Sequence, residues 1–167
     1  MSTLPTAAEE TRFWAVLESA WESLGPEPAR LRKALLDGDS AAADALDPYL
    51  DPFVAALRTA AADLTGAELT ALDRVAERTL HELDREDIHE VTDGSDDGFL
   101  YCRGFILAVG RDYVSAVLAD PSLAVVDAEC ESVCYLFAHQ HADRFGDFPE
   151  TGSGISRESF ANPAGWS

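Results

Sequence analysis

Apolar side chains recur at intervals of three and four residues along most of this chain, and that spacing is the strongest constraint on its fold. The opening stretch shows it most clearly, because Phe13, Trp14, Leu17 and Trp21 share one face before Gly25 interrupts the pattern. Such a period is typical of an amphipathic helix, whereas a half-buried strand would alternate apolar and polar residues. No stretch of useful length alternates in that way. We therefore predict an all-α fold, a single compact bundle-like domain of about six or seven helices.

Three long helices are expected to dominate the second half of the chain. Their predicted ranges are Ala67 to Val91, Asp96 to Val109 and Val125 to Phe145. The second is apolar on nearly every side, which predicts a central, buried position. Ser95 comes directly before it and is a favourable N-cap, since its hydroxyl can accept a hydrogen bond from the first turn.

The composition changes after Gly146. From Thr151 onward the chain is rich in Gly, Ser and Pro, which favours an extended segment over a further helix. We therefore divide the chain into a helical domain, residues 1–146, and an extended C-terminal tail, residues 147–167.

The net charge, and the way the basic residues are distributed, indicate which classes of partner the protein can bind. The 167 residues include 31 acidic and 12 basic ones, which gives a formal net charge of −19. No segment gathers the lysine and arginine that contacts with nucleic-acid phosphates or anionic lipids require. We therefore expect no nucleic-acid partner and no membrane partner, and a basic protein partner or a small anionic ligand remain possible.

The start of the chain and its cysteines indicate a compartment. Residues 1–10 lack the basic and apolar regions of a signal peptide, and no run approaches the roughly 18 apolar residues of a membrane span. Cys102, Cys130 and Cys134 are an odd number without a disulfide pattern, which is typical of reduced, buried thiols. Both observations predict a cytoplasmic protein.

Carboxylates concentrate at the junction before the central helix. Glu90, Asp93, Asp96 and Asp97 are oxygen ligands of the kind that Mg²⁺ or Ca²⁺ prefers, and they could equally meet a basic partner. Their spacing is not that of an EF-hand loop, and helix capping explains the last two without any ligand. We therefore favour capping and solvation, keep this acidic cluster as a candidate site for a partner or a cation, and assign no metal to it.

Arg103 is the one charged residue inside the apolar stretch from Phe99 to Val109. A buried guanidinium needs a partner, and Glu131 or Asp97 is the partner we expect. The same arginine, together with Tyr101 two residues before it, could instead hold the carboxylate or phosphate of an anionic ligand in a pocket between helices.

Three residues of the last predicted helix form a stripe with the groups that proton transfer needs. Glu131, Tyr135 and His139 follow one another at intervals of four, and they are our candidate catalytic residues. Stripes of this kind are also common on solvated helix surfaces. Cys130 and Cys134 share an apolar face, which argues against a zinc site, and no nucleotide-binding loop or nucleophile elbow is present. The sequence indicates no cofactor.

One block of sequence resembles a known family. The block is Ser-Asp-Asp-Gly-Phe-Leu-Tyr-Cys-Arg-Gly-Phe-Ile at residues 95–106, and it is followed by Gly110, Tyr113 and the Ala-Asp-Pro run at residues 119–121. Together with Phe-Trp at residues 13–14, it is similar to the signature of the domain of unknown function 4240 family over roughly residues 11–146. That resemblance implies a bacterial, helical domain with no settled activity.

We interpret the chain as an acidic cytoplasmic binding, regulatory or accessory protein, with its acidic surface centred on Asp93 to Asp97. The alternative is a small tailoring enzyme of a bacterial pathway. In that alternative, Arg103 would anchor an anionic small molecule in a pocket between helices, and Glu131, Tyr135 or His139 would move protons.

Overall fold

The structure is a computed structural model that describes residues 2–167. Over that range it contains helices and no strand, which confirms the all-α prediction. The α-helices are α1 (Ala7–Glu22), α2 (Pro26–Leu36), α3 (Ala42–Leu46), α4 (Leu50–Ala61), α5 (Gly66–Glu82), α6 (Glu86–Thr92), α7 (Asp96–Val109), α8 (Arg111–Ala119), α9 (Glu131–Cys134) and α10 (Leu136–Phe145). Single 3-10 turns lie at Asp47–Tyr49, Pro121–Leu123 and Pro163–Gly165.

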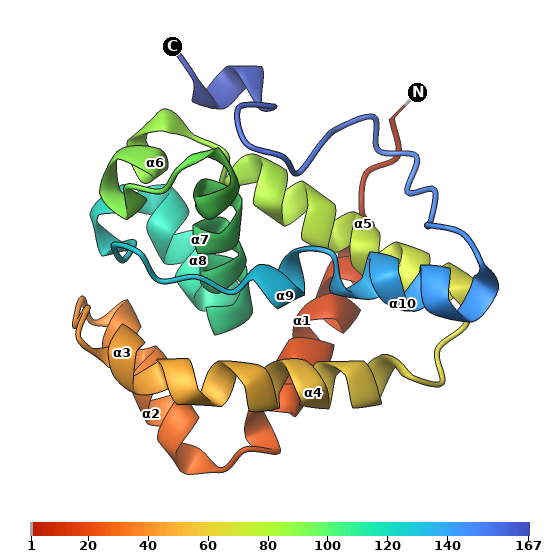
Figure 1. Ribbon diagram of the computed structural model, residues 1–167, viewed down its shortest axis with the longest axis horizontal. Helices are drawn as coiled ribbons and strands as arrows, with labels where there is room; N and C mark the ends of the chain where they lie inside the picture. The colour runs from red at the N-terminus through yellow and green to blue at the C-terminus, as the bar shows by residue number, and fades with distance from the viewer. Residues whose placement is uncertain (1) are drawn as a thin grey trace.

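The helices pack around one core (Figure 1). In that view α4 runs along one edge, α5 and α10 lie along the opposite side, and α1 crosses between them. Helix α1 contacts both α4 and α5, and α5 contacts α10. The two ends of the chain lie on the same side as α5, where residues 147–162 cross it without forming a helix.

Local sequence explains where two of these helices begin. The hydroxyls of Thr6 and Thr65 each accept a hydrogen bond from the backbone N–H three residues later, and the carboxylates of Glu9 and Glu68 accept one from the backbone N–H of that threonine. This reciprocal pair satisfies two N–H groups that a helix start otherwise leaves without partners. The threonine-to-glutamate spacing therefore fixes the starts of α1 and α5.

The central position predicted for α7 is confirmed. All but three of its residues are buried, and Ser95 caps it by accepting a hydrogen bond from the Gly98 N–H at 3.3 Å. Gly104 lets α9 approach closely, because a Cβ at that position would lie 2.6 Å from both the Cys130 carbonyl oxygen and the Cys134 sulfur. The glycine in the middle of this helix is thus a packing requirement.

The predicted helix from Ala67 to Val91 is interrupted. Helix α5 ends at Glu82 and α6 begins at Glu86, with extended backbone at Arg85. Asp84, between them, is fully buried and accepts hydrogen bonds from the backbone N–H groups of residues 160–162. Because those donors come from the far end of the chain, local periodicity could not reveal the break.

The predicted helix from Val125 to Phe145 is also wrong in its first part. Residues 124–130 form a loop, in which the Cys130 N–H donates to the Tyr101 carbonyl oxygen at 2.9 Å and Asp127 has a left-handed backbone. Val126 in this loop is 57% exposed. Tyr135 then separates α9 from α10. The two interruptions contribute to a larger number of helices than the pattern suggested.

Among the described residues, no helix is both long and apolar enough to cross a membrane.

Candidate functional site

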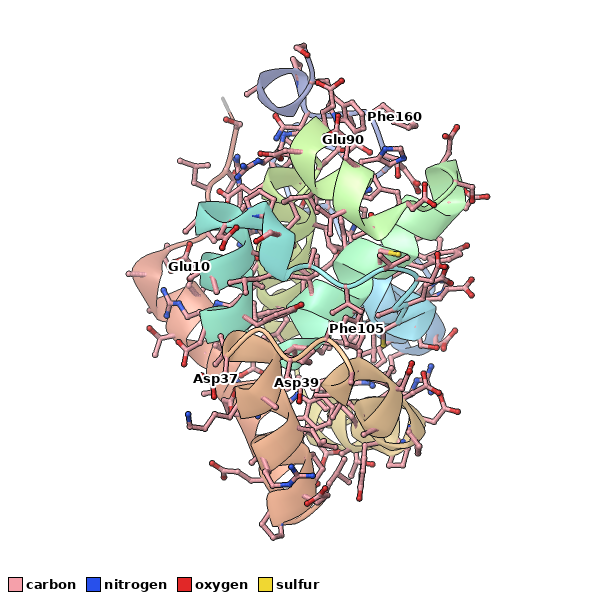
Figure 2. The ribbon with its side chains drawn as sticks, turned by 90° about the vertical axis from the view of Figure 1, so that its left-hand side faces the viewer. Glu10, Asp37, Asp39, Glu90, Phe105 and Phe160 are labelled. Carbon is pink, nitrogen blue, oxygen red and sulfur yellow. The ribbon has the colours of Figure 1, made fainter. Side chains whose placement is uncertain are left out.

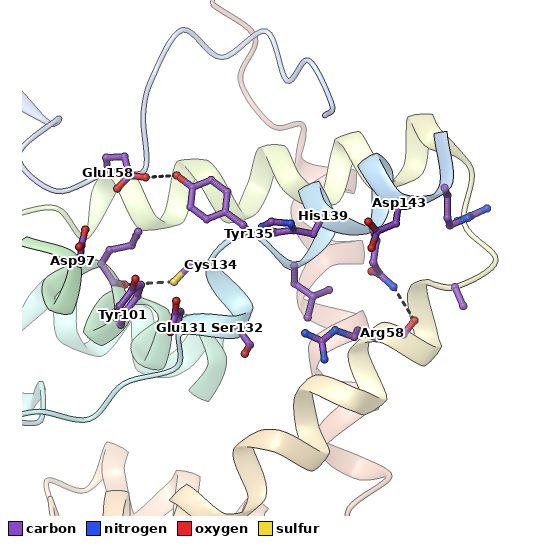
Figure 3. Close-up of a pocket in the computed structure, with 15 residues that line it drawn as sticks. Arg58, Asp97, Tyr101, Glu131, Ser132, Cys134, Tyr135, His139, Asp143 and Glu158 are labelled. Carbon is purple, nitrogen blue, oxygen red and sulfur yellow. Dashed lines mark hydrogen bonds between the residues drawn. The ribbon is translucent and has the colours of Figure 1, made fainter. Parts of the chain in front are cut away.

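A half-enclosed groove of about 830 Å³ opens between α4, α7, α9 and α10. We call it the main groove (Figure 3). Its lining residues are Arg58, Ala62, Asp97, Leu100, Tyr101, Glu131, Ser132, Cys134, Tyr135, Leu136, His139, Gln140, Asp143, Arg144 and Glu158. Glu158 belongs to the C-terminal segment, by which we mean residues 147–167, so the wall of the groove combines the helical domain with its tail.

The folding of α7 and α9 places the candidate residues in the groove. Asp97 and Tyr101 lie one turn apart at the start of α7, whose position the Ser95 cap sets. Glu131 is the first residue of α9, and Tyr135 is the break between α9 and α10. With His139 of α10, the groove therefore gathers five residues that the sequence singled out for different reasons.

Two phenol and carboxylate pairs stand at one end of the groove, which we call the acidic end. The Tyr135 hydroxyl donates to a Glu158 carboxylate oxygen at 2.5 Å. Burial and this neighbouring carboxylate raise the pKa of Tyr135, and burial together with the charge of Glu131 raises the pKa of Tyr101. Both phenols therefore stay protonated at neutral pH, and the carboxylates beside them make this end of the groove electronegative.

The other end of the groove carries charges of both signs, Arg58 and Asp143. Figure 3 shows the Arg58 side chain on the opposite side from Asp97 and Glu158.

The side-chain nitrogen of Gln140 donates to the Arg58 carbonyl at 3.0 Å, whereas the buried side-chain oxygen of Gln140 finds no hydrogen-bond partner within residues 2–167. A buried acceptor without a donor is unusual, because leaving it unpaired costs about 1–3 kcal/mol. It could take an N–H group from a ligand.

The stripe of Glu131, Tyr135 and His139 lines the groove, although it does not lie on one continuous helix. The ring centroids of Tyr135 and His139 are 6.2 Å apart and meet edge to face. The Tyr135 proton is directed to Glu158, away from the other two candidates. As placed, the three are neighbours in a groove and do not form a hydrogen-bonded relay.

The predicted acidic junction is only partly in the groove. Glu90, Asp93, Asp96 and Asp97 are all exposed, and only Asp97 lines the cavity. Glu90 lies toward the end of the molecule that also carries Phe160 (Figure 2). In the part of the chain that the structure describes, no three His, Cys, Asp or Glu side chains come together as a metal site would need.

Arg103 lies inside the protein and does not line the groove that Tyr101 lines. It is fully buried, and its guanidinium donates to the carbonyls of Leu80 at 2.7 Å and Arg157 at 2.8 Å, and to the Ser159 hydroxyl at 3.0 Å. These oxygens replace the carboxylates of Glu131 and Asp97 that we had expected. Burial lowers the pKa of Arg103, against the opposing influence of Asp84.

A second buried arginine was missed by the sequence analysis. Arg157 of the C-terminal segment binds Asp73 through two hydrogen bonds of 2.9 Å, and it also reaches Glu77 at 3.3 Å and the Cys134 carbonyl at 2.7 Å. Its guanidinium lies 4.6 Å from the centre of the Tyr135 ring. Burial disfavours the charge, but Asp73 and Glu77 outweigh it and hold the pKa of Arg157 above its ordinary value. We call this set of contacts the Arg157 slot.

A signal for this slot was present in the sequence. Asp73 occupies the same face of α5 as Leu69, Ala76 and Leu80, all of which are buried. An acid on an apolar stripe requires a cation, because an isolated buried carboxylate is too costly to keep. The sequence did not say which of the distant arginines would supply it.

The three cysteines are buried and unpaired. Burial raises the pKa of Cys130 to about 11 and those of Cys102 and Cys134 to about 12. Thiols of this kind remain protonated and are poor nucleophiles.

A protein-family model described as "Protein of unknown function (DUF4240)" matches residues 8–143. The match includes the walls of the groove that come from α4, α7, α9 and most of α10, and it ends before the C-terminal segment. Neither the curated proteins nor the solved structures gave a match.

Proposed function

The chain belongs to the DUF4240 family of proteins of unknown function, and from that premise we propose that it is a binding protein with a regulatory or accessory role, whose main groove receives a basic segment of a partner protein. The observation that carries this proposal is the acidic end of the groove. There, Asp97, Glu131 and Glu158 stand beside the phenols of Tyr101 and Tyr135.

The charge of the protein supports a basic partner. A net charge of −19 attracts cations at long range, and a groove with carboxylate walls concentrates that field. A lysine ammonium or an arginine guanidinium entering the acidic end would make charge-assisted hydrogen bonds to the carboxylates. The Tyr101 ring adds a face on which such a cation can lie.

The placement of Arg103 weakens the case for an anionic ligand in this groove. The cation that would have held such a ligand is buried and already donates to three oxygens of the protein. Glu131, Tyr135 and His139 do share the cavity, so the tailoring-enzyme alternative stays a prediction.

A peptide titration tests the proposal. A short dye-labelled oligolysine peptide is titrated with the protein at low salt, and binding is followed by fluorescence anisotropy. The groove variant is Asp97→Asn with Glu131→Gln. The matched control is Asp37→Asn with Asp39→Asn, which removes the same charge from exposed residues between α2 and α3 (Figure 2).

We expect the groove variant to bind on the order of tenfold more weakly, since two lost contacts of about 0.5–1 kcal/mol each change the dissociation constant by roughly that factor. The control should bind nearly as well as the original protein, and binding should weaken as salt rises. Equal losses in the two variants would mean that net charge alone attracts the peptide, and the groove proposal would then fail.

A further inference from the structure

The C-terminal segment is held to the helical domain by contacts of the kind that a receptor makes with a peptide. In the Arg157 slot, the guanidinium pairs with buried Asp73 and with partly buried Glu77. Before it, the Thr151 hydroxyl donates to Glu77 at 2.7 Å. After it, the Ser159 hydroxyl donates to the Asp96 carbonyl at 2.6 Å. The segment between these points forms no helix of its own.

Asp84 provides a second anchor for the segment. Its carboxylate accepts the successive backbone N–H groups of residues 160–162 at 2.7–3.0 Å, and the Trp166 indole N–H at 3.1 Å. Phe160 has a left-handed backbone, with φ of 67°, which helps to turn consecutive N–H groups toward one acceptor. Because these bonds use main-chain N–H groups, they depend little on which side chains residues 160–162 carry.

The acceptors and the donors of these hydrogen bonds come from two different parts of the chain. The acceptors, buried Asp73 and Asp84 and partly buried Glu77, lie within the family match at residues 8–143. The guanidinium of Arg157 and the N–H groups of residues 160–162 lie outside it. The helices therefore present a row of carboxylates along α5 and just past its end, and a separate extended segment satisfies them.

We propose that this row is a binding channel for an extended, arginine-bearing peptide, and that the chain's own residues 151–166 occupy it in cis. The same segment of a second copy of this chain would be a competing ligand. This channel follows α5 and adjoins the acidic end of the main groove, because Tyr135 borders both and Glu158 of the segment lines the groove. The inference goes beyond the proposed function, since it concerns a different ligand and the contacts of Asp73, Glu77 and Asp84.

The geometry also defines what the ligand must carry. The paired bonds to Asp73 and the stack on Tyr135 use the planar, forked guanidinium, which a lysine ammonium cannot reproduce. A serine two residues later meets both the Asp96 carbonyl and Arg103. The ligand class is thus an extended peptide with arginine and serine two positions apart.

The connection between the two parts offers a place to test this. Asp147, Phe148 and Glu150 are exposed. A protease cleavage sequence inserted between Asp147 and Glu150 allows the folded, full-length protein to be cut once, leaving the segment bound by its contacts alone. A dye-labelled synthetic peptide of residues 151–167 is then added, and its binding is followed by anisotropy and size-exclusion chromatography.

We expect the cut protein to keep its helical circular dichroism and to exchange its segment for one labelled peptide per chain. The uncut protein should bind the peptide far more weakly, because its own segment competes at an effective concentration in the millimolar range. An Arg157→Lys peptide should bind the cut protein at least about tenfold more weakly. A composition-matched peptide in which residues 157 and 158 exchange places should bind no better than the lysine peptide.

Three results would overturn the proposal. Loss of the helical signal after cutting would make the segment an inseparable part of the core. A segment that never exchanges with the labelled peptide would exclude a binding channel. If the composition-matched peptide bound the cut protein as tightly as the peptide of residues 151–167, the Arg157 slot would not select its occupant.

Discussion

Replacing Arg157 with methionine should destabilise this protein far more than removing an exposed arginine. The side chains of Arg157 and Asp73 are only 5% and 4% exposed, and Glu77 beside them is 13% exposed. Methionine fills much of the same volume but leaves two carboxylates in the interior without a cation. Breaking one side of a buried ion pair in this way costs about 3–5 kcal/mol.

That free energy corresponds to a measurable fall in Tm. For a domain of 150–250 residues, each kcal/mol lowers Tm by about 2–4 °C, so Arg157→Met should lower it by about 6–20 °C. The assay is thermal unfolding followed by circular dichroism, at neutral pH and constant salt. The matched control is Arg30→Met, since Arg30 pairs with Glu27 on the surface and both side chains are about half exposed or more, at 66% and 49%.

A second variant separates the lost cation from lost packing. Adding Asp73→Asn to Arg157→Met removes one of the stranded charges and should recover part of the stability. If Arg157→Met lowers Tm no more than Arg30→Met does, then the buried acids do not depend on this arginine and the reasoning is refuted.

Three further outcomes follow from the packing and the shifted pKa values. Gly104→Ala should lower the free energy of unfolding by about 1–3 kcal/mol in urea titrations, because the added Cβ would overlap α9. Gly66→Ala is the control and should be tolerated, because a Cβ there would have its nearest neighbouring atom at 3.4 Å. Burial raises the pKa of Cys130 from an ordinary value of 9.0 to about 11, so as pH rises the thiol of the unfolded protein loses its proton before that of the folded protein. The free energy of unfolding should therefore fall as pH rises from about 9 toward 11, which urea unfolding at each pH measures. Asp84→Asn should release residues 160–162, because an amide nitrogen would face N–H donors; hydrogen exchange at those amides should speed up, and unchanged exchange would contradict their capture by Asp84.

The parts of this fold that follow from local pattern were predictable, and those that depend on distant partners were not. The run from Phe99 to Val109 has so few polar residues that burial of α7 could be foreseen, and Ser95 marked where it begins. The interruption at Asp84 carries no Gly or Pro signal. Its cause is a set of N–H donors about 76 residues away in sequence, which periodicity cannot detect.

The candidate site shows the same division. Glu131, Tyr135 and His139 were singled out from their spacing and Tyr101 as a ligand-binding neighbour of Arg103, and all four line one groove. The expected partner of Arg103 was wrong, because carbonyl and hydroxyl oxygens can satisfy a guanidinium as well as carboxylates can, and sequence patterns carry no record of main-chain acceptors. The groove position of Glu158 was missed because it depends on the path of a segment without periodicity.

Because Glu158 lines the groove, the shape of its opening depends on a segment that lies outside the family match. The floor and most walls of the groove come from the region that defines the family, whereas one wall comes from beyond it. A substitution in the tail can therefore reshape the opening without disturbing a single helix. Relatives that share the helical domain but end in different segments would offer differently shaped openings on a common scaffold, and grafting one tail onto another domain would transfer that shape with it.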